Sequence, residues 1–408
     1  MRLYLFSPIP YTFLHQRPQN IAGELLQRSI DVTFVEPYGL TEFFAGRKKL
    51  RLRDPFISLF YHLAGLWYLL VRHRTVVPVR GGRKAQSFEI LTLPFVIPSN
   101  RLNSSFLDRL NAAVYRAWLR RNVLCREGCR DGDVALVQQP YFGEVIEQGD
   151  FTRVYYDCID EAGVFSGRGS RERLRQSEER LLKLASAVFV TSRKLEEDLS
   201  SRVPGTPLHR IPNGVNTSLF HKPASAGSRP ELPKGIKRPV AGYVGILRSW
   251  FDYDLIERLA SGLPDLSVVL IGPYEETPVV QRVKSLPNVH FLGRKEYREV
   301  PSYIQEFDVG LIPFKSGEIA ETTNPVKLFE YFAAGKPVVS TWLRELVPFQ
   351  EQGLLTITDH DRCVGDVREA LADSDAQRAD RRRAVAQEHT WGQLVGKMTG
   401  VISENSVR

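Results

Sequence analysis

Short runs of apolar, β-branched and aromatic residues alternate with longer amphipathic runs along almost the whole chain. In the first half, the short runs predict β-strands at 2–6, 32–35, 88–93, 133–138, 153–157, 187–191 and 208–212. Helical patterns separate them at 18–28, 104–124, 171–185 and 192–200. This alternation is typical of β-α-β units, which place their strands in a parallel sheet. The chain is therefore expected to adopt an α/β fold.

The same alternation restarts after a stretch rich in Pro, Gly, Ser and Lys. Predicted strands lie at 240–245, 266–272, 288–293, 308–314, 336–341 and 354–358, with helices at 252–261, 278–285, 296–306 and 324–334. We therefore expect two Rossmann-like, doubly wound domains that face each other across a cleft. The predicted division is an N-terminal domain over 1–222, a linker over 223–238 and a C-terminal domain over 239–377. A single C-terminal helix over 378–408, amphipathic at about 378–403, is expected to return to the first domain.

Composition places the protein among ordinary globular chains. Hydrophobic residues make up 43% of the 408 residues and charged residues 25%, which excludes a disordered chain, a collagen-like chain and a polytopic membrane protein. Four cysteines cannot build a disulfide framework of the secreted type, and we interpret them as reduced thiols. The first apolar run is too short for a secretion signal. A cytoplasmic protein is expected.

Positive charge is concentrated in one segment. The net charge is +8, and between residues 47 and 84 ten Lys and Arg residues face one acid, Asp54. They flank the apolar run 55–71, which falls short of the roughly 20 residues that cross a bilayer. Two interpretations stay open: a helix lying on the inner face of the cell membrane, or a buried helix between two basic loops. No nucleic-acid partner is expected, since no nucleic-acid-binding signature accompanies the charge.

The segment 323–341, TNPVKLFEYFAAGKPVVST, carries the strongest functional signal. Asn324 and Pro325 predict a helix start, and the spacing of Lys327 and Glu330 places both on one helix face. A helix N-terminus with a nearby lysine can hold a phosphate, and a carboxylate can accept hydrogen bonds from both hydroxyls of a ribose. The alternative is an ordinary ion pair on an exposed helix, which the two residues alone would favour.

This segment resembles the nucleotide-sugar-binding helix of glycosyltransferases with the GT-B fold, notably the retaining family 4. Segments 243–260 and 287–314 fit the same pattern, and FLHQRPQNIAGELL (13–26) is similar to teichuronic-acid and exopolysaccharide glycosyltransferases. The resemblance implies a hexosyltransferase that moves a sugar from a nucleoside-diphosphate donor, UDP as first choice and GDP as second. It implies a glycan or lipid-linked acceptor in cell-envelope polysaccharide biosynthesis, an acceptor-binding first domain and no metal or other cofactor.

The resemblance carries over residue by residue to the donor site. Glu330 falls on the second glutamate of the family's E-x7-E motif, which contacts the ribose, whereas Thr322 stands where the first glutamate belongs. Arg248, three residues after Gly245, is the cation available in the first loop of the second domain. Gly293 and Arg294 resemble the loop that receives the nucleobase. The expected donor-binding set is Gly245, Arg248, Gly293, Arg294, Thr322, Asn324, Lys327 and Glu330.

Two motifs of the first domain complete the predicted site. His15 and Arg17 follow the first strand, where the family has a glycine-rich loop, and are expected to contact phosphate or acceptor hydroxyls; the alternative is a simple helix start at Pro18. Asp157 and Asp160 lie at the end of a strand and are the predicted catalytic carboxylates, with Asp157 the first choice. Helix capping is the alternative for Asp160 and Glu161. Retention versus inversion stays open.

The triplet Asp252-Tyr253-Asp254 is spaced like a metal-binding D-x-D motif, but its position predicts a helix start and no bound metal.

Other functions remain as alternatives. A nucleotide-sugar epimerase would share the architecture. A non-catalytic scaffold, binding a partner or a membrane through 47–84, would explain the missing first glutamate. A dehydrogenase is not expected, because neither domain opens with G-x-G-x-x-G.

Overall fold

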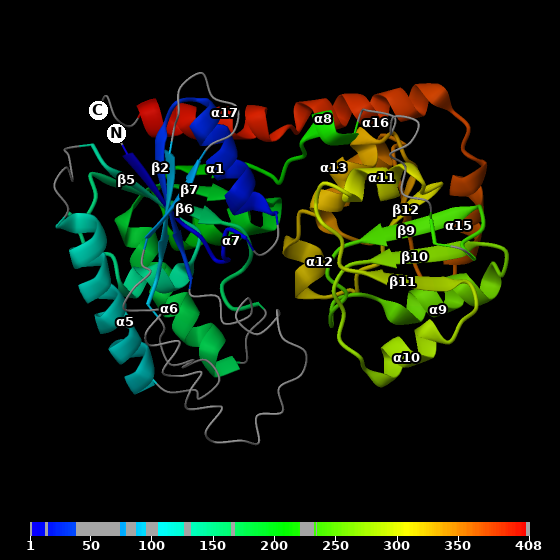
Figure 1. The fold of residues 1–408 in the computed structure, drawn as a ribbon, viewed down its shortest axis with the longest axis horizontal. Helices are drawn as coiled ribbons and strands as arrows, with labels where there is room; N and C mark the ends of the chain where they lie inside the picture. The colour runs from blue at the N-terminus through cyan, green and yellow to red at the C-terminus, as the bar shows by residue number, and fades with distance from the viewer. Residues whose placement is uncertain are drawn as a thin grey trace. The chain divides into compact units, whose positions relative to one another are not determined.

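The chain of the computed structural model divides into two compact units (Figure 1). The first comprises Met1–Val190, Leu195–Arg210 and Lys397–Arg408, and the second comprises Thr191–Lys194 and Ile211–Gly396. The C-terminal segment therefore joins the first unit. The structure describes residues 2–12, 15–37, 74–78, 87–94, 105–125, 132–164, 168–220, 232–233 and 235–404.

The first unit is built on an eight-stranded sheet in the order β3-β4-β2-β1-β5-β6-β7-β8. Its strands are β1 (Arg2–Phe6), β2 (Asp31–Glu36), β3 (Arg74–Pro78), β4 (Ser87–Thr92), β5 (Val134–Val137), β6 (Arg153–Cys158), β7 (Ala185–Val190) and β8 (Leu208–Arg210). All neighbours are parallel except β3 and β4. Strand β3 was not predicted, because its five residues lie inside the basic segment 47–84. The predicted helix 55–71 lies outside the described residues.

Helices cover both faces of this sheet. They are α1 (Arg17–Gln27), α5 (Ser105–Leu119), α6 (Arg168–Leu184) and α7 (Arg193–Arg202), with a π-helix η1 (Arg120–Leu124) and a 3-10 helix η2 (Pro140–Glu144). Side chains of α5, α6 and α7, among them Trp118, Leu181 and Leu195, join Phe6 and Tyr156 in one apolar core. On the other face Tyr155 donates a hydrogen bond to the Ile402 carbonyl of the C-terminal helix at 3.4 Å.

The second unit contains a six-stranded parallel sheet in the order β11-β10-β9-β12-β13-β14. The strands are β9 (Val240–Val244), β10 (Ser267–Ile271), β11 (Val289–Gly293), β12 (Val309–Ile312), β13 (Val338–Thr341) and β14 (Thr356–Thr358). The chain builds outward from β9 in one direction and then returns to add β12 on its other side. In doubly wound sheets this switch point, here between β9 and β12, is where ligands bind at the carboxyl ends of the strands.

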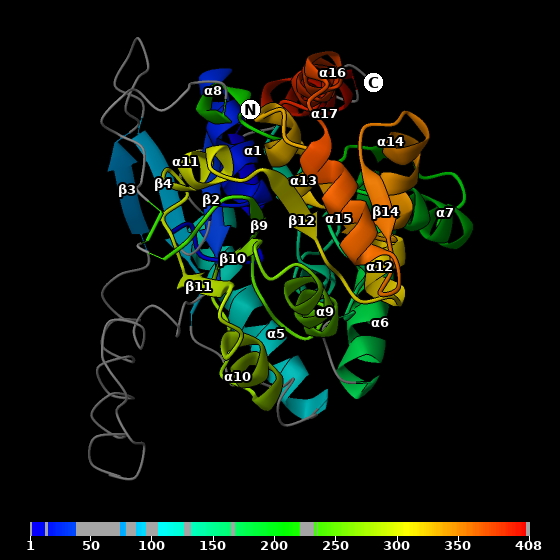
Figure 2. The ribbon, with the colours of Figure 1, turned by 90° about the vertical axis from the view of Figure 1, so that its right-hand side faces the viewer.

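Helices again form two layers, which Figure 2 shows on either side of the sheet. Helices α9 (Tyr253–Gly262), α10 (Pro278–Lys284) and α15 (Cys363–Ala372) pack together on one face, and α8 (Thr217–Phe220), α11 (Val300–Gln305), α13 (Val326–Ala333) and α16 (Ala376–Glu388) on the other. The remaining elements are α12 (Glu318–Thr322), η3 (Arg344–Leu346), α14 (Val347–Glu351) and α17 (Trp391–Glu404).

The amphipathic segment 378–403 was expected to form one helix, and this prediction was wrong. It forms α16 and α17, separated at His389 and Thr390. The His389 carbonyl accepts a hydrogen bond from the Val215 amide at 3.0 Å, and Val215 forms a β-bridge with Thr390. This pairing with a distant segment takes the two residues out of the helical path, which the local pattern could not reveal.

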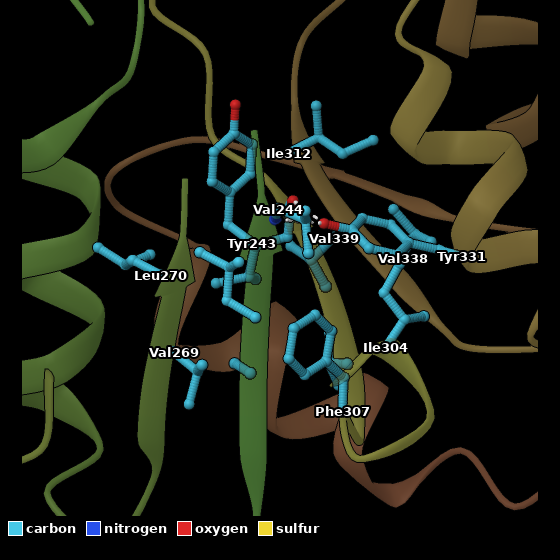
Figure 3. Close-up of a cluster of buried hydrophobic side chains, with 14 of the residues drawn as sticks. Tyr243, Val244, Val269, Leu270, Ile304, Phe307, Ile312, Tyr331, Val338 and Val339 are labelled. Carbon is cyan, nitrogen blue, oxygen red and sulfur yellow. Dashed lines mark hydrogen bonds between the residues drawn. The ribbon is translucent and has the colours of Figure 1, made fainter. Parts of the chain in front are cut away.

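Two glycines let aromatic rings pack directly on the second sheet (Figure 3). A Cβ atom on Gly242 of β9 would lie 2.3 Å from the Phe307 ring, and one on Gly310 of β12 would lie 2.5 Å from the Tyr331 ring. Both rings are fully buried. The bare backbone of the two strands therefore brings Tyr331, and with it helix α13, close to the switch point.

Candidate active site

Three glycines line the carboxyl edge of the second sheet. Gly245 and Gly272 directly follow β9 and β10, and Gly293 ends β11. The Gly245 amide donates to the Ile271 carbonyl at 2.8 Å, and the Gly272 amide donates to the Gly293 carbonyl at 2.9 Å. Gly272 has φ +145°, and a Cβ atom there would lie 1.8 Å from the Gly245 carbonyl oxygen. At Gly272 the missing Cβ makes room for the protein's own backbone, whereas a Cβ atom on Gly293 would meet nothing within 4 Å. The Gly293 end of the edge therefore leaves open space that a ligand can approach closely.

The predicted cations beside this edge are both exposed. Arg248 follows Gly245 in the loop after β9, and its guanidinium lies 3.5 Å from Glu275 in an ion pair between two largely exposed side chains. Arg294 follows Gly293. A surface ion pair of this kind contributes at most about 1 kcal/mol, so Arg248 can exchange its partner for a phosphate.

Helix α13 begins with no capping side chain. Its N-cap is Pro325, and no acidic residue lies in its first turn. The first amide groups of a helix carry partial positive charge, which attracts anions when no side chain caps them. Asn324 was predicted to open the helix and lies just outside it. Its side-chain oxygen accepts from the Asn213 amide at 2.9 Å, and its carbonyl accepts from the Asn213 side chain at 2.8 Å.

Lys327 and Glu330 form an ion pair with 2.7 Å between Nζ and Oε2. It is not the exposed pair of the alternative interpretation, because the Glu330 side chain is only 1% exposed. Oε1 of Glu330 has no hydrogen-bond partner among the described residues. Burial, together with the negative charge of Glu330, raises the pKa of the Tyr297 phenol. A buried acceptor without a donor is costly unless a ligand supplies one.

Tyr331 ties helix α13 to the switch point. The ladder between β9 and β12 ends at Gly242 and Gly310, so the amide of Val244 has no strand partner there. That amide donates to the Tyr331 hydroxyl at 3.1 Å, and the hydroxyl lies 3.4 Å from the Gly242 carbonyl and 3.3 Å from that of Leu311 (Figure 3). Burial raises the pKa of this phenol well above its ordinary value.

Sequence reasoning did not single out Tyr331 or Asn213. Glycines inside two predicted strands were the available signal for Tyr331, since such glycines indicate close approach of another group. For Asn213 the signal was its place between Pro212 and Gly214, which is typical of a turn. Thr322, at the position of the family's first glutamate, is buried and donates to the Glu318 carbonyl of α12 at 3.1 Å.

In the first unit, Arg17 and Asp157 form a buried bidentate ion pair. Nε and Nη2 of Arg17 donate to the two carboxylate oxygens at 2.9 and 2.7 Å, and Gln138 donates to Oδ2 at 2.8 Å. Arg17 is 3% exposed and Asp157 0%. Arg17 opens α1 while Gln138 and Asp157 follow or end β5 and β6, so the cluster lies at the carboxyl edge of the first sheet. Its strong internal pairing leaves Asp157 without a free oxygen.

Asp160, three residues later, is exposed. Desolvation by the surrounding protein raises the pKa of its carboxyl to about 6, and the positive charge of Arg17 opposes this rise. Because water reaches the side chain, solvation also limits the shift. Glu161 instead pairs with Arg171 and Arg175 of α6 at 2.6 and 2.5 Å. Of these carboxylates, Asp160 is the one open to solvent with a pKa near neutrality.

His15, the last of the predicted site residues, lies just before α1, where side-chain hydrogen bonds stabilise the start of the helix. His15 is exposed, and its Nε2 lies 3.0 Å from the Asn20 side-chain oxygen. The Gln16 amide donates to the Gln19 side chain at 3.1 Å, which in turn donates to the Pro10 carbonyl at 3.1 Å. These bonds hold Gln16, and with it the neighbouring His15, at the start of α1.

The D-x-D triplet is a helix start, as predicted. Asp252 is the N-cap of α9 and accepts from the Leu255 amide at 3.0 Å, while Asp254 pairs with Arg282 at 2.7 Å. Within the described ranges, no group of three or more His, Cys, Asp or Glu side chains is placed to hold a metal ion. In the same ranges, none of the helices combines the length and hydropathy needed to cross a membrane.

Comparison with known proteins agrees with this architecture. Residues 238–373 match the family described as "Glycosyl transferases group 1". The chain is 28% identical over 267 residues to TuaH of Bacillus subtilis (strain 168), whose name assigns it to teichuronic acid biosynthesis as a glycosyltransferase; the match covers 61% of this chain and 67% of TuaH.

Solved structures show the same fold at low sequence identity. Sucrose-phosphate synthase from Thermosynechococcus elongatus has a TM-score of 0.69 at 16% identity, covering 100% of this chain and 99% of that one. WaaG, a glycosyltransferase involved in lipopolysaccharide biosynthesis, has a TM-score of 0.63 at 16% identity, covering 98% and 99%. Anabaena HepE in complex with UDP and glucose has a TM-score of 0.59 at 14% identity, covering 99% of both chains. The chain thus has the GT-B fold, and its residues 238–373 match the glycosyl transferases group 1 family.

Proposed function

We propose that this protein transfers a sugar from a nucleoside-diphosphate donor to a glycan or lipid-linked acceptor in cell-envelope polysaccharide biosynthesis. The observation that carries the proposal is the arrangement on α13. An uncapped helix N-terminus, Lys327 and a buried Glu330 oxygen that no described residue contacts by a hydrogen bond lie within one helix of eight residues. These groups match the diphosphate and the ribose of such a donor. The family match over 238–373 supports the same assignment.

The donor would occupy the carboxyl edge of the second sheet. Its diphosphate would accept hydrogen bonds from the first amides of α13 and charge from Lys327, with Arg248 as a second cation. The open oxygen of Glu330 would accept a ribose hydroxyl. The glycine edge at Gly245 and Gly293 would admit the phosphates and the base beside bare backbone, with Arg294 adjacent. Thr322 and Asn324 would support the loop leading into α13 rather than contact the donor.

The chemistry follows from where charge develops. As the bond between the anomeric carbon and the diphosphate breaks, negative charge grows on the departing phosphate, and the α13 terminus with Lys327 would stabilise it. The proposal assigns this work to these residues and to no metal ion. UDP is the first choice of leaving group, and the HepE structure with UDP and glucose shows such a ligand on this fold.

The first unit would bind the acceptor at the carboxyl edge of its sheet. Asp160 is the proposed base that takes the proton from the acceptor hydroxyl, because it is exposed and its pKa is raised to about 6. Asp157 would act through Arg17, whose charge it holds in place, and His15 would contact acceptor hydroxyls from the exposed loop. A lipid-linked acceptor also requires the protein to reach a membrane, and the basic segment 47–84 is the proposed contact on the cytoplasmic side.

A donor screen followed by a transfer assay tests the proposal. Thermal shift and calorimetry with UDP-, GDP- and dTDP-sugars would identify the donor, since a bound ligand raises the melting temperature. The identified donor is then incubated with a lipid-linked glycan acceptor, and release of nucleoside diphosphate is measured.

We expect acceptor-dependent release that is lost in Lys327→Ala and Glu330→Ala. Conversion of the sugar without acceptor would instead indicate an epimerase. Absence of binding to every nucleotide sugar would contradict the proposal and favour a non-catalytic scaffold.

A further inference from the structure

Helix α5 carries a stripe of apolar side chains on its solvent side. Phe106 is 66% exposed, Leu110 44% and Val114 39%, and the exposed Ala113 and Ala117 continue the same face. Spacings of three and four residues align these five side chains, which we call the α5 stripe. Five large apolar side chains are exposed among the described residues, and three of them belong to this stripe.

The opposite face of α5 is firmly held. Trp118 and Leu119 are buried in the core of the first unit, and the Tyr115 ring stacks on Phe142 with 6.4 Å between centroids. Arg116 donates to the Val145 carbonyl at 2.9 Å and also pairs with Asp150. The rotation of the helix about its axis is therefore fixed, and the stripe faces outward because of this packing. In Figure 1 helix α5 lies along the outer border of its unit.

The exposed charged residues between 105 and 121 are all arginines. Arg109, Arg120 and Arg121 are exposed, and no acidic residue is exposed between residues 105 and 121. Arg120 lies 3.8 Å from Glu147 in a pair between two well-exposed side chains. The half-buried Asp108 already pairs with Arg173 at 2.5 Å. An apolar stripe bordered by arginines matches an anionic lipid surface, where apolar side chains enter the interface and guanidinium groups reach the headgroup phosphates.

We propose that the α5 stripe, with Arg109, Arg120 and Arg121, docks the protein on an anionic phospholipid bilayer. A second copy of the chain fits this surface poorly, because pairing two α5 helices along their stripes would bring the arginines of both helices together. The inference deepens the proposed function, since a lipid-linked acceptor resides in the bilayer. It rests on described residues and does not depend on the segment 47–84.

Vesicle flotation tests the proposal on the full chain without nucleotide. Vesicles of phosphatidylcholine with roughly one-third phosphatidylglycerol are compared with pure phosphatidylcholine. We expect binding to the anionic vesicles, lowered about tenfold or more in Phe106→Gln/Leu110→Gln because two inserting side chains are lost. Arg109→Gln/Arg121→Gln should weaken binding and reduce the preference for anionic lipid. The matched control is Trp342→Gln, which removes an exposed apolar side chain of the second unit and should bind like wild type.

A variant in which the Lys and Arg residues of 47–53 are neutralised is floated separately, and its loss of binding measures how much the basic segment contributes to vesicle binding. Equal flotation of Phe106→Gln/Leu110→Gln and wild type would overturn the proposal. A dimer in light scattering that this variant abolishes, with vesicle binding unchanged, would assign the stripe to a second copy and also overturn it. Nucleotide binding in solution is measured on the same variants. Failure of the proposed function would appear there and would leave the flotation result unaffected.

Discussion

The amide of Val244 donates a hydrogen bond to the hydroxyl of Tyr331 at 3.1 Å, joining the last residue of β9 to the middle of α13. The neighbours of these two residues are Gly245 on the glycine edge and Glu330 on the helix. One hydroxyl therefore sets the spacing between the backbone that would receive the phosphates and the side chains that would bind the diphosphate and ribose. Tyr331 is a positioning residue in this account.

Removing this hydroxyl should weaken both the fold and donor binding. Tyr331→Phe keeps the ring on Gly310 but leaves the Val244 amide unpaired, and we expect a loss of about 1–2 kcal/mol in the free energy of unfolding. The dissociation constant for UDP should rise several-fold in calorimetry. Ser340→Ala is the control, because it removes a buried hydroxyl that donates to the Ile312 carbonyl at 3.0 Å in the same sheet. If Tyr331→Phe and Ser340→Ala lowered UDP affinity equally, Tyr331 would only stabilise the fold and would not position the donor site.

Lys327 should contribute to the diphosphate and not to the nucleoside. In Lys327→Ala we expect UDP affinity to fall by about 10–100-fold, the loss of one charge-assisted contact, while uridine affinity stays within about twofold. The variant also leaves the Glu330 carboxylate without its cation, so its melting temperature is measured in parallel. A similar loss for UDP and uridine would show that the lysine acts through the fold.

Substitutions at Asp157 and Asp160 should have different effects: the first should lower the stability of the fold, and the second should abolish sugar transfer. Asp157→Asn breaks the buried pair with Arg17, and we expect a loss of about 3–5 kcal/mol in the free energy of unfolding, measured by urea denaturation. Asp160→Asn removes a charge that the surrounding protein desolvates, so it should not lower stability at neutral pH, while it abolishes transfer. The reverse pattern, a stable and inactive Asp157→Asn beside an active Asp160→Asn, would restore Asp157 as the base.

The pKa of Asp160 predicts a pH dependence. With its pKa raised from 3.8 to about 6, the carboxyl is protonated and unable to act as a base at pH 5. The rate kcat/KM should therefore increase with pH through a midpoint near 6. Stability should change in the opposite direction: the raised pKa favours the native state below pH 3.8, and this contribution is lost as pH rises through 6. If kcat/KM instead rose with pH through a midpoint near 4, the titrating group would not be Asp160.

Much of the fold could be predicted because buried parallel strands read as uninterrupted apolar runs. Runs such as 240–245 and 266–272 match β9 and β10 closely. Lys327 and Glu330 could also be placed on one helix face, because their contact is local. Strand β3 escaped prediction since it pairs antiparallel with β4 at the border of the sheet and its sequence is basic at the start.

Contacts between residues far apart in the sequence could not be predicted from local patterns. Arg17 and Asp157 are 140 residues apart, and only the strand order that brings β1, β5 and β6 together makes them partners. The helix at 104–124 was predicted, but apolar residues occur on more than one of its faces. Periodicity could not tell that Trp118 would be buried and Phe106 exposed.

Calorimetric titration of wild-type protein and folded Glu330→Gln with UDP tests the central claim most directly. The claim is that the unpartnered oxygen of a buried carboxylate on α13 accepts a ribose hydroxyl. We predict binding by the wild type and a dissociation constant about 10–100-fold higher for the variant, because an amide is a weaker acceptor than a carboxylate. Equal affinities for UDP, or no binding by the wild type, would contradict the account.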